Sequence, residues 1–497
     1  MTEIRVAYTG FIAFAIRLVS IVTGLIFTLI VTRQLSVEEF GTWGLINGVI
    51  IYAVIIHPIV SYWSTRETAR GEDTGKTAIS TTSLFSLIGI SVYIIIAYIV
   101  GLQSDADVGL LLFAVILIPV IFINEALNAI VTGFKPHIKS YGFLIFEITK
   151  IPVALLLVYY FQWGLEGAII ASFVAYVASI VLLISYAKEK MRGAIKRSYI
   201  KKWTRLFWVP VYRMIPSLIS MSDVVVFSIV TGSVVGVAYY TAARTIGFLV
   251  THTRAIGLGV YPRLLEGGHE KVLQNNLMQF FYVAFPIMAL SIIIAKPGLF
   301  ALNPIYTIAA PVVILLTFRQ FLTTINLMLF QALQGIEKVD LDKDATFRDY
   351  AKSKLILFPT FQMIRHAIYI GSLVAILILL NTEDGTEIEL VVYWALIGLI
   401  VEIPLSIYII KLTKKSFTLK LNLKSVFKYL ASSVIIFGVM YLLMEEYLVY
   451  DNSIFEFLPK VILFVIVGVT SYLAVTYVID DKTKSLVKAA VKEITKK

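Results

Sequence analysis

The stretch Val31–Trp43, VTRQLSVEEFGTW, is a short polar segment between two long apolar runs, and it decides how the start of the chain folds. Ser36, followed three residues later by Glu39, forms a capping box, in which each side chain binds a backbone N–H at the start of a helix. Gly41 allows a second helix to approach closely, and Trp43 is typical of the depth where membrane meets water. The stretch therefore predicts a tight turn between two membrane-spanning helices.

The composition of the whole chain indicates an integral membrane protein. Of 497 residues, 59% are hydrophobic and only 15% are charged, and the mean hydropathy is +0.86. Soluble domains carry about 25% charged residues. The chain has no Cys, which excludes disulfides, thiol catalysis and Cys-based metal sites. The net charge of +11 is interpreted as a topology signal, so we expect no nucleic-acid partner.

Apolar runs long enough to cross about 30 Å of hydrocarbon predict fourteen helices. Lys and Arg concentrate in every second loop, so the positive-inside rule places both termini in the cytoplasm of a multi-pass protein of the cell membrane. The loops on the opposite side are short and leave no room for an external catalytic domain. The expected spans are 11–32, 41–63, 78–102, 108–131, 141–161, 164–187, 208–230, 236–260, 278–300, 305–333, 355–380, 391–410, 426–443 and 458–479.

An internal repeat suggests how these helices are grouped. SVEEFGTW at 36–43 and SVVGVAYY at 233–240 share one pattern at an offset of 197 residues, and each half begins inside and has six helices, so the copies are parallel. We therefore predict an all-α polytopic fold with two six-helix lobes. The expected parts are the N-terminal lobe 1–187, a cytoplasmic basic connector 188–207, the C-terminal lobe 208–410, a cytoplasmic basic loop 411–425, two further helices in 426–479 and a cytoplasmic tail 480–497.

Three segments resemble one transporter family. An Arg, a Leu, a small residue, acids, then Phe-Gly and an aromatic, as in 33–43, resembles the signature of polysaccharide-transporter (Wzx-like) flippases, a branch of the multidrug/oligosaccharidyl-lipid/polysaccharide exporter superfamily. YYTAARTIGFLVTHTRAIGLGVYPRL at 239–264 is similar to the eighth helix of that family, and FQALQGIEK at 330–338 resembles its tenth-helix exit. Val37 departs from the pattern, because a Pro is common there.

The resemblance implies a specific architecture and activity. The two lobes would surround a central cavity that opens alternately inward and outward and moves a lipid-linked oligosaccharide to the outer leaflet, for surface polysaccharide or glycoprotein assembly. The segment 426–479 would form a groove for the lipid tail. The substrate, membrane lipids and glycan assembly enzymes are the expected partners.

Ionisable residues inside the spans are the best independent pointers to function, because charges facing lipid are costly. Positive charges outnumber negative ones, which suits an anionic substrate such as a pyrophosphate, since guanidinium groups bind phosphate oxygens in pairs. The basic residues are Arg17, Lys150, Arg213, Arg244, Arg254, Arg319 and Arg365, and the acidic ones are Glu125, Glu147, Asp223 and Glu402.

We assign substrate binding to four arginines and note simpler alternatives for some charges. The predicted substrate-binding residues are Arg17, Arg244, Arg254 and Arg319. For Arg254, the alternative is a local pair with His252. Arg213 and Arg365 lie near the cytoplasmic ends of their helices and can reach the interface.

A second set of four charges is assigned to coupling or gating. Glu147 and Lys150, spaced i, i+3, either serve coupling or simply neutralise each other. Asp223 is either a structural partner of Arg244 or a proton or cation site. Arg33 either gates the outer mouth, with Glu38 as partner, or contacts a lipid headgroup.

No sequence motif indicates enzyme chemistry. The chain has no phosphate-binding Gly loop, zinc helix motif or nucleophile elbow, so we expect no enzyme, no metal and no cofactor, with energy from a Na+ or H+ gradient or the membrane potential. The leading function is an oligosaccharide-lipid flippase. The alternatives are a cation-coupled multidrug antiporter of the same superfamily, a membrane glycosyltransferase, and a channel or scaffold.

Overall fold

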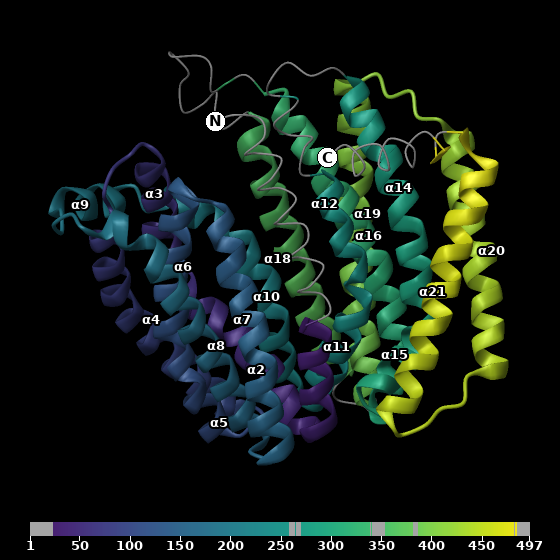
Figure 1. The fold of residues 1–497 in the computed structure, drawn as a ribbon, viewed down its shortest axis with the longest axis horizontal. Coiled ribbons are helices and arrows are strands. Elements are labelled where there is room, and N and C mark those ends of the chain that lie inside the picture. The colour runs from purple at the N-terminus through teal and green to yellow at the C-terminus, as the bar shows by residue number, and fades with distance from the viewer. Residues whose placement is uncertain are drawn as a thin grey trace. The chain divides into compact units, whose positions relative to one another are not determined.

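The fold was examined in a computed structural model of the chain. It describes residues 23–257, 264, 270–337, 339, 353–380, 386–481 and 483–484. These residues form helices joined by short loops and contain no β-strand, which confirms the all-α prediction (Figure 1).

The predicted spans correspond to long apolar helices, although the count of fourteen is not confirmed. Within the described residues, eleven helices are long and apolar enough to cross a membrane, or twelve if a pair bent by 64°, Val37–Val54 and Pro58–Ala69, is one span. Two predicted spans fall outside this count. Span 11–32 is described only from residue 23, and span 236–260 is divided into short helices.

The opening turn forms as the sequence predicts. Ser36 is the N-cap of helix α2 (Val37–Val54), its hydroxyl accepts the N–H of Glu39 at 3.1 Å, and Glu39 accepts the N–H of Ser36 at 3.0 Å. Gly41 lies against the turn before α11, where an added Cβ would be 2.0 Å from the backbone oxygen of Val234. The two copies of the repeat are therefore in contact, and only a glycine fits at that point of α2.

The chain divides into two compact units, and the first contains residues 1–241 and 370–387. A helix at 23–34 opens its described part, and α9 is an amphipathic helix in the basic connector that the span prediction did not include. The other helices of unit 1 are α2, α3 (Pro58–Ala69), α4 (Gly75–Gln103), α5 (Val108–Phe113), η1 (Ala114–Ile116), α6 (Leu117–Phe134), α7 (His137–Ala154), the π-helix η2 (Leu155–Tyr160), α8 (Gly164–Ala187), η3 (Lys188–Met191), α9 (Arg197–Arg205), α10 (Trp208–Thr231) and the first part of α11 (Val235–Gly247).

The second unit contains residues 242–369 and 388–497, and its described part holds the remaining helices. After α11 they are η4 (Leu249–Thr253), α12 (Arg254–Gly257), α14 (Glu270–Ile293), α15 (Ala295–Leu302), η5 (Pro304–Ala309), α16 (Ala310–Gly335), α18 (Lys354–Leu380), α19 (Glu387–Ser416), α20 (Leu423–Tyr447) and α21 (Ile454–Ile479). Residues 370–380 of α18 are assigned to unit 1. The predicted lobe boundaries at 187, 208 and 410 stay a prediction.

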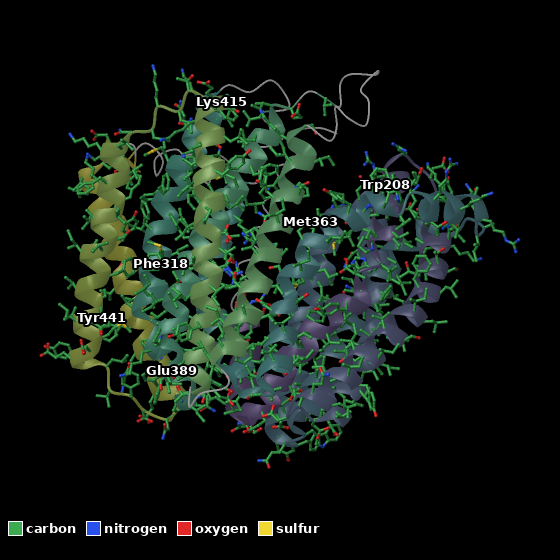
Figure 2. The ribbon with its side chains drawn as sticks, turned by 180° about the vertical axis from the view of Figure 1, so that it is seen from behind. Trp208, Phe318, Met363, Glu389, Lys415 and Tyr441 are labelled. Carbon is green, nitrogen blue, oxygen red and sulfur yellow. The ribbon has the colours of Figure 1, made fainter. Side chains whose placement is uncertain are left out.

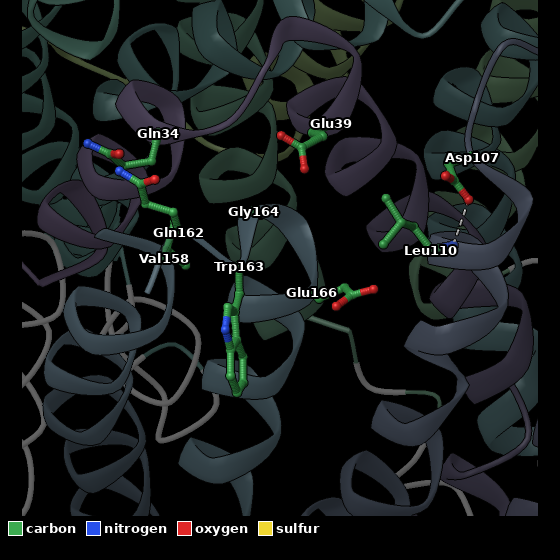
Figure 3. Close-up of a pocket in the computed structure, with 9 residues that line it drawn as sticks. All are labelled: Gln34, Glu39, Asp107, Leu110, Val158, Gln162, Trp163, Gly164 and Glu166. Atoms are coloured by element: carbon green, nitrogen blue, oxygen red, sulfur yellow. Dashed lines mark hydrogen bonds between the residues drawn. The ribbon is translucent and has the colours of Figure 1, made fainter. Parts of the chain in front are cut away.

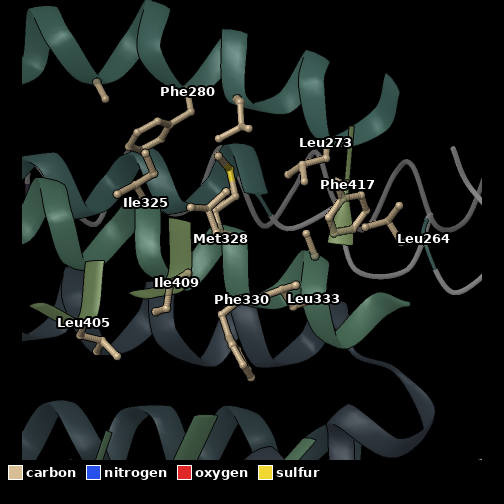
Figure 4. Packing of buried hydrophobic residues seen from close by; sticks show 14 residues of the cluster. Leu264, Leu273, Phe280, Ile325, Met328, Phe330, Leu333, Leu405, Ile409 and Phe417 are labelled. Atoms are coloured by element: carbon tan, nitrogen blue, oxygen red, sulfur yellow. The ribbon is translucent and has the colours of Figure 1, made fainter. Parts of the chain in front are cut away.

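A hydrophobic core holds the helices of unit 2 together. Aromatic and aliphatic side chains of α14, α16 and α19 interdigitate in one buried cluster (Figure 4), in which Phe280 is fully buried and Phe330 stacks on Phe358 of α18 at 3.6 Å between ring centroids. Met328 and Ile409 fill the space between α16 and α19. This packing sets how α16, α18 and α19 face one another. These three helices carry the charged residues described next.

Candidate functional site

Charged side chains meet at the middle of three long helices of unit 2. Arg319 lies at the midpoint of the apolar segment Pro304–Gly335, and Glu402 at the midpoint of α19. Arg365 is close to the middle of α18. Figure 2 shows Glu389 at one end of α19 and Lys415 at the other, so Glu402 is far from either end. Charges at this depth are costly unless they are paired or face a polar cavity.

Arg365 and Glu402 form the ion pair of this site. A guanidinium nitrogen of Arg365 contacts one carboxylate oxygen of Glu402, and both side chains are nearly buried, at 10% and 2% exposed. The other carboxylate oxygen accepts from Asn326 of α16 at 2.8 Å, and the same amide donates to Ser406 at 2.8 Å. Glu402 is therefore satisfied at both oxygens, as a buried carboxylate must be.

Arg319 is positioned by aromatic side chains and by a glycine. Its guanidinium carbon is 4.5 Å from the ring centroid of Tyr369, whose hydroxyl accepts from the indole N–H of Trp394 at 2.7 Å. Gly398 of α19 lies directly against the guanidinium, because a Cβ there would be 2.5 Å from Arg319 Nη1. A cation placed over an aromatic face is stabilised by the ring, so Tyr369 helps to orient the guanidinium of Arg319.

Arg254 and His366 complete the cluster. Arg254, at the start of α12, is exposed and adds a further positive charge to unit 2. His366 is buried, and its Nε2 is 2.6 Å from a guanidinium nitrogen of Arg365. Since a guanidinium only donates, Nε2 must accept and His366 is neutral. Among the described residues named here, three arginines and one glutamate together carry a net charge of +2.

The surplus charge determines what the site can bind. A charged Arg at the centre of a bilayer costs about 2.5–3.5 kcal/mol on insertion scales, and the described charges named here are three guanidinium groups and the carboxylate of Glu402. An anion with several oxygens would offset this cost, because each guanidinium binds oxygens through a planar fork of donors. The arrangement is thus suited to a phosphate or diphosphate group and unsuited to a cation.

A second buried ion pair lies in unit 1. Lys150 Nζ is 3.2 Å from Glu147, and both residues of α7 are under 10% exposed. Thr23 donates to the same carboxylate at 3.3 Å, and Lys150 lies over the ring of Phe27 at 4.5 Å. The alternative that these two charges neutralise each other is therefore supported, and the pair has no surplus charge to offer a ligand.

The other predicted site residues are not brought into one place by the described contacts. Asp223 is buried in α10 of unit 1, where its carboxylate accepts the N–H of Val224 at 2.9 Å. Arg244 lies over the ring of Phe248 at 4.7 Å, and Arg33 is half-buried. Their predicted roles stay predictions. Arg17 and Arg213 are not available for comparison, since Arg17 lies outside the described residues and the side chain of Arg213 is not described.

Sequence reasoning found two of the three clustered arginines and left the position of the third open. Arg254 and Arg319 are predicted for the substrate, whereas for Arg365 the sequence leaves open whether it reaches the cytoplasmic interface or stays within the span. In the structure Arg365 is nearly buried and paired with Glu402, which favours the second alternative. The signal that points to the site is position along the span: Arg319 and Glu402 lie at the midpoints of their segments. Tyr369, Trp394 and Asn326 carry no such signal.

The fold and the site define a polytopic helical membrane protein with charged side chains buried at mid-span. The chain shares its fold with two solved transporter structures. The lipid II flippase MurJ, in an inward closed conformation, matches with a TM-score of 0.66 at 16% identity, over 94% of this chain and 98% of that one. An inward-facing multidrug resistance MATE family transporter of the MOP superfamily matches with a TM-score of 0.60 at 16% identity, over 82% and 98%. No family model and no curated protein matches the sequence.

These similarities show the fold alone. Both neighbours are transporters and neither is described as an enzyme. The polysaccharide-transporter branch that the sequence motifs predicted is not among them, and the identities are low enough that substrate class has to be argued from the residues.

Proposed function

We propose that this protein is a flippase that moves a polyprenyl-(pyro)phosphate-linked oligosaccharide from the cytoplasmic to the outer leaflet of the cell membrane by alternating access, as a member of the Wzx-like branch. The observation that carries this proposal is the set of basic side chains near mid-span in unit 2, with Arg319 over Tyr369 and Arg365 paired with Glu402. A site with this charge at mid-span selects an anionic headgroup.

Within the site the arginines have different parts. Arg365 is held by Glu402, so it orients the carboxylate and fixes the neighbouring helices. Arg319, over Tyr369, is proposed to bind a phosphate oxygen. Arg254 is exposed and would meet the phosphate first. Arg244 and Arg17 are proposed to contribute further contacts, and Asp223, Glu147, Lys150 and Arg33 to support coupling or gating.

The proposal includes an energy source and partners. The chain carries no nucleotide-binding motif, so a Na+ or H+ gradient or the membrane potential would drive the cycle. The net charge of the arginine site makes the membrane potential relevant, because moving one elementary charge across 100 mV changes the free energy by about 2.3 kcal/mol. Membrane lipids and glycan assembly enzymes are the proposed partners, and both termini are placed in the cytoplasm.

The test uses the purified full chain in lipid vesicles. The probe is the lipid-linked oligosaccharide pool extracted from the cells that make the protein, labelled on its glycan, and the readout is the fraction that becomes accessible at the opposite leaflet. Wild type should transport the probe, and Arg319→Ala should slow transport about tenfold or more, the loss expected for one charged hydrogen bond. Arg192→Ala, an exposed arginine of the connector, is the matched control and should transport like wild type.

A cation-coupled multidrug antiporter remains the second candidate, because Asp223 of unit 1 is a carboxylate buried within α10, at 6% exposed. The same vesicles separate the two functions. Efflux of a lipophilic cation such as tetraphenylphosphonium, together with no movement of the lipid-linked pool, would support the antiporter and overturn the flippase.

A further inference from the structure

A wide polar pocket opens at the predicted outer end of unit 1. It encloses about 730 Å³, which is within the range of about 300–1,000 Å³ typical of small-ligand sites. Its polar lining consists of Gln34, Glu39, Asp107, Gln162, Trp163 and Glu166. In the view of Figure 3, Gln34 and Gln162 lie on one side and Asp107 on the other, with Glu39 and Glu166 between them.

The backbone around this pocket is shaped by an unusual segment. The π-helix η2 ends at Tyr160, and Gln162 and Gly164 follow with positive φ angles of 56° and 52°. Glu39 fixes this turn, since its carboxylate accepts the N–H of Leu165 at 3.2 Å and a Cβ on Gly164 would be 2.4 Å from the same oxygen. A π-helical turn followed by a non-glycine residue at positive φ is common at functional sites. Here it directs Gln162 and Trp163 to the pocket.

The chemistry of the lining limits the ligand. The lining contains three carboxylates, two amides and an indole, and it contains no Lys, Arg or His, so a phosphate is excluded by repulsion. Among the described residues, no three His, Cys, Asp or Glu side chains are arranged to hold a metal ion. Carboxylates and amides that are spread over a broad surface beside an aromatic ring are suited to a hydroxyl-rich ligand, because they accept and donate hydrogen bonds while the ring covers an apolar face.

We propose that this pocket binds the glycan part of the cargo, as a phosphate-free oligosaccharide site on the outer side of unit 1. The inference rests on the proposed function for the source of the glycan. It adds a second recognition site, which is lined by carboxylates and amides where the first site is lined by arginines. The arginine cluster takes the phosphate, and the pocket takes the sugar hydroxyls. Glu166, Gln162 and Gln34 are exposed and supply the direct contacts, while Glu39 and Asp107 also cap helices, each with an oxygen on a backbone N–H.

The test measures binding of free glycan, without lipid or phosphate. The probe is the oligosaccharide released by mild acid from the lipid-linked pool of the host cells, titrated calorimetrically into the purified full chain. Wild type should bind it, and Glu166→Ala should weaken binding about tenfold. Glu456→Ala is the matched control, because Glu456 is also an exposed acid in the first turn of a helix, α21, and lies outside the pocket.

A second substitution separates a sugar from a cation. Glu166→Gln keeps a hydrogen-bonding group without charge. If the ligand is a sugar, the affinity of the Glu166→Gln variant for the glycan should lie between those of wild type and Glu166→Ala, and it should change little with salt concentration. If the glycan does not bind, or if Glu166→Ala binds it as wild type does, the proposal is overturned. If spermine binds instead, and if its binding is lost equally in both variants and is weakened by salt, the pocket is a cation site. Transport of the lipid-linked pool by wild type would leave the flippase function standing in each of these cases.

Discussion

Substituting Gly398 tests whether Arg319 binds the ligand, without removing any charged residue. In Gly398→Ala, the new Cβ would lie 2.5 Å from Arg319 Nη1 and 2.7 Å from Cζ. Non-bonded heavy atoms approach to about 3.5 Å, so the guanidinium has to move by about 1 Å. Because the obstacle is the end of a flexible side chain, the helix can keep its path while Arg319 leaves its position over Tyr369.

The expected result is a loss of ligand affinity with little loss of stability. A displaced guanidinium forfeits a charge-assisted hydrogen bond worth about 1.5–3 kcal/mol, which corresponds to roughly tenfold to a hundredfold in affinity. The assay is native mass spectrometry of the purified chain with a polyprenyl diphosphate that carries no sugar, with the thermal midpoint measured in parallel.

Gly371→Ala is the matched control, since an added Cβ on that glycine of α18 meets nothing within 4 Å. It should bind the polyprenyl diphosphate as wild type does and should be slightly more stable, because Ala is favoured over Gly in a helix by about 1 kcal/mol. Unchanged binding in Gly398→Ala, or an equal loss in Gly371→Ala, would refute the reasoning about Arg319.

Three further predictions concern stability. Glu402→Ala leaves Arg365 buried without its partner and should lower stability by about 3–5 kcal/mol, whereas the double change Arg365→Met with Glu402→Leu should recover most of it, as measured by thermal unfolding in detergent. Gly41→Ala should lower the thermal midpoint, because the new Cβ meets backbone rather than a movable side chain. The Tyr199 hydroxyl donates to Glu72 at 2.6 Å and, with Lys196 nearby, lowers the pKa of the Glu72 carboxyl. A carboxyl whose pKa is lowered by folding stabilises the folded state at pH values above its pKa in the unfolded chain, about 4, and this stabilisation is lost as the pH falls. Tyr199→Phe should therefore lose less stability than wild type on acidification.

Each of these has a control or a contrary outcome. Gly24→Ala, where an added Cβ meets nothing within 4 Å, should unfold at the same temperature as wild type. If Gly41→Ala changed the thermal midpoint no more than Gly24→Ala does, the close contact with Val234 would not matter for stability. A double variant no more stable than Glu402→Ala would show that the ion pair is not what Glu402 contributes. An acid profile unchanged by Tyr199→Phe would remove Glu72 as a source of pH dependence.

Much of the fold could be predicted because membrane insertion imposes local rules. Hydrocarbon thickness sets the length of an apolar run, and backbone groups in lipid must be satisfied within one helix. The spans 78–102, 164–187 and 208–230 accordingly match α4, α8 and α10 within a few residues. Breaks inside a helix were not predicted, such as the 64° bend between α2 and α3, because a bend depends on neighbouring helices.

The site was only partly predictable for the same reason. That Arg319, Arg365 and Glu402 are unusual could be read from their place in apolar runs, since each charge is costly by itself. Which of them pair is a property of three helices in contact. The ion pair of Arg365 with Glu402, and the glycine that admits Arg319, exist only where α16, α18 and α19 are packed together.

The sequence by itself determined that the chain is a multi-spanning helical protein, where its turns are capped, and that it carries more positive than negative charge at membrane depth. These properties follow from hydropathy, from short-range hydrogen bonds and from the cost of a charge in lipid, all of which act along the chain. The tertiary structure alone decided that Glu402 is shared by Arg365 and Asn326, and that Gln34, Glu39 and Glu166 line one pocket. The two contacts of Glu402 join residues that are 37 and 76 positions apart, and no local rule specifies them.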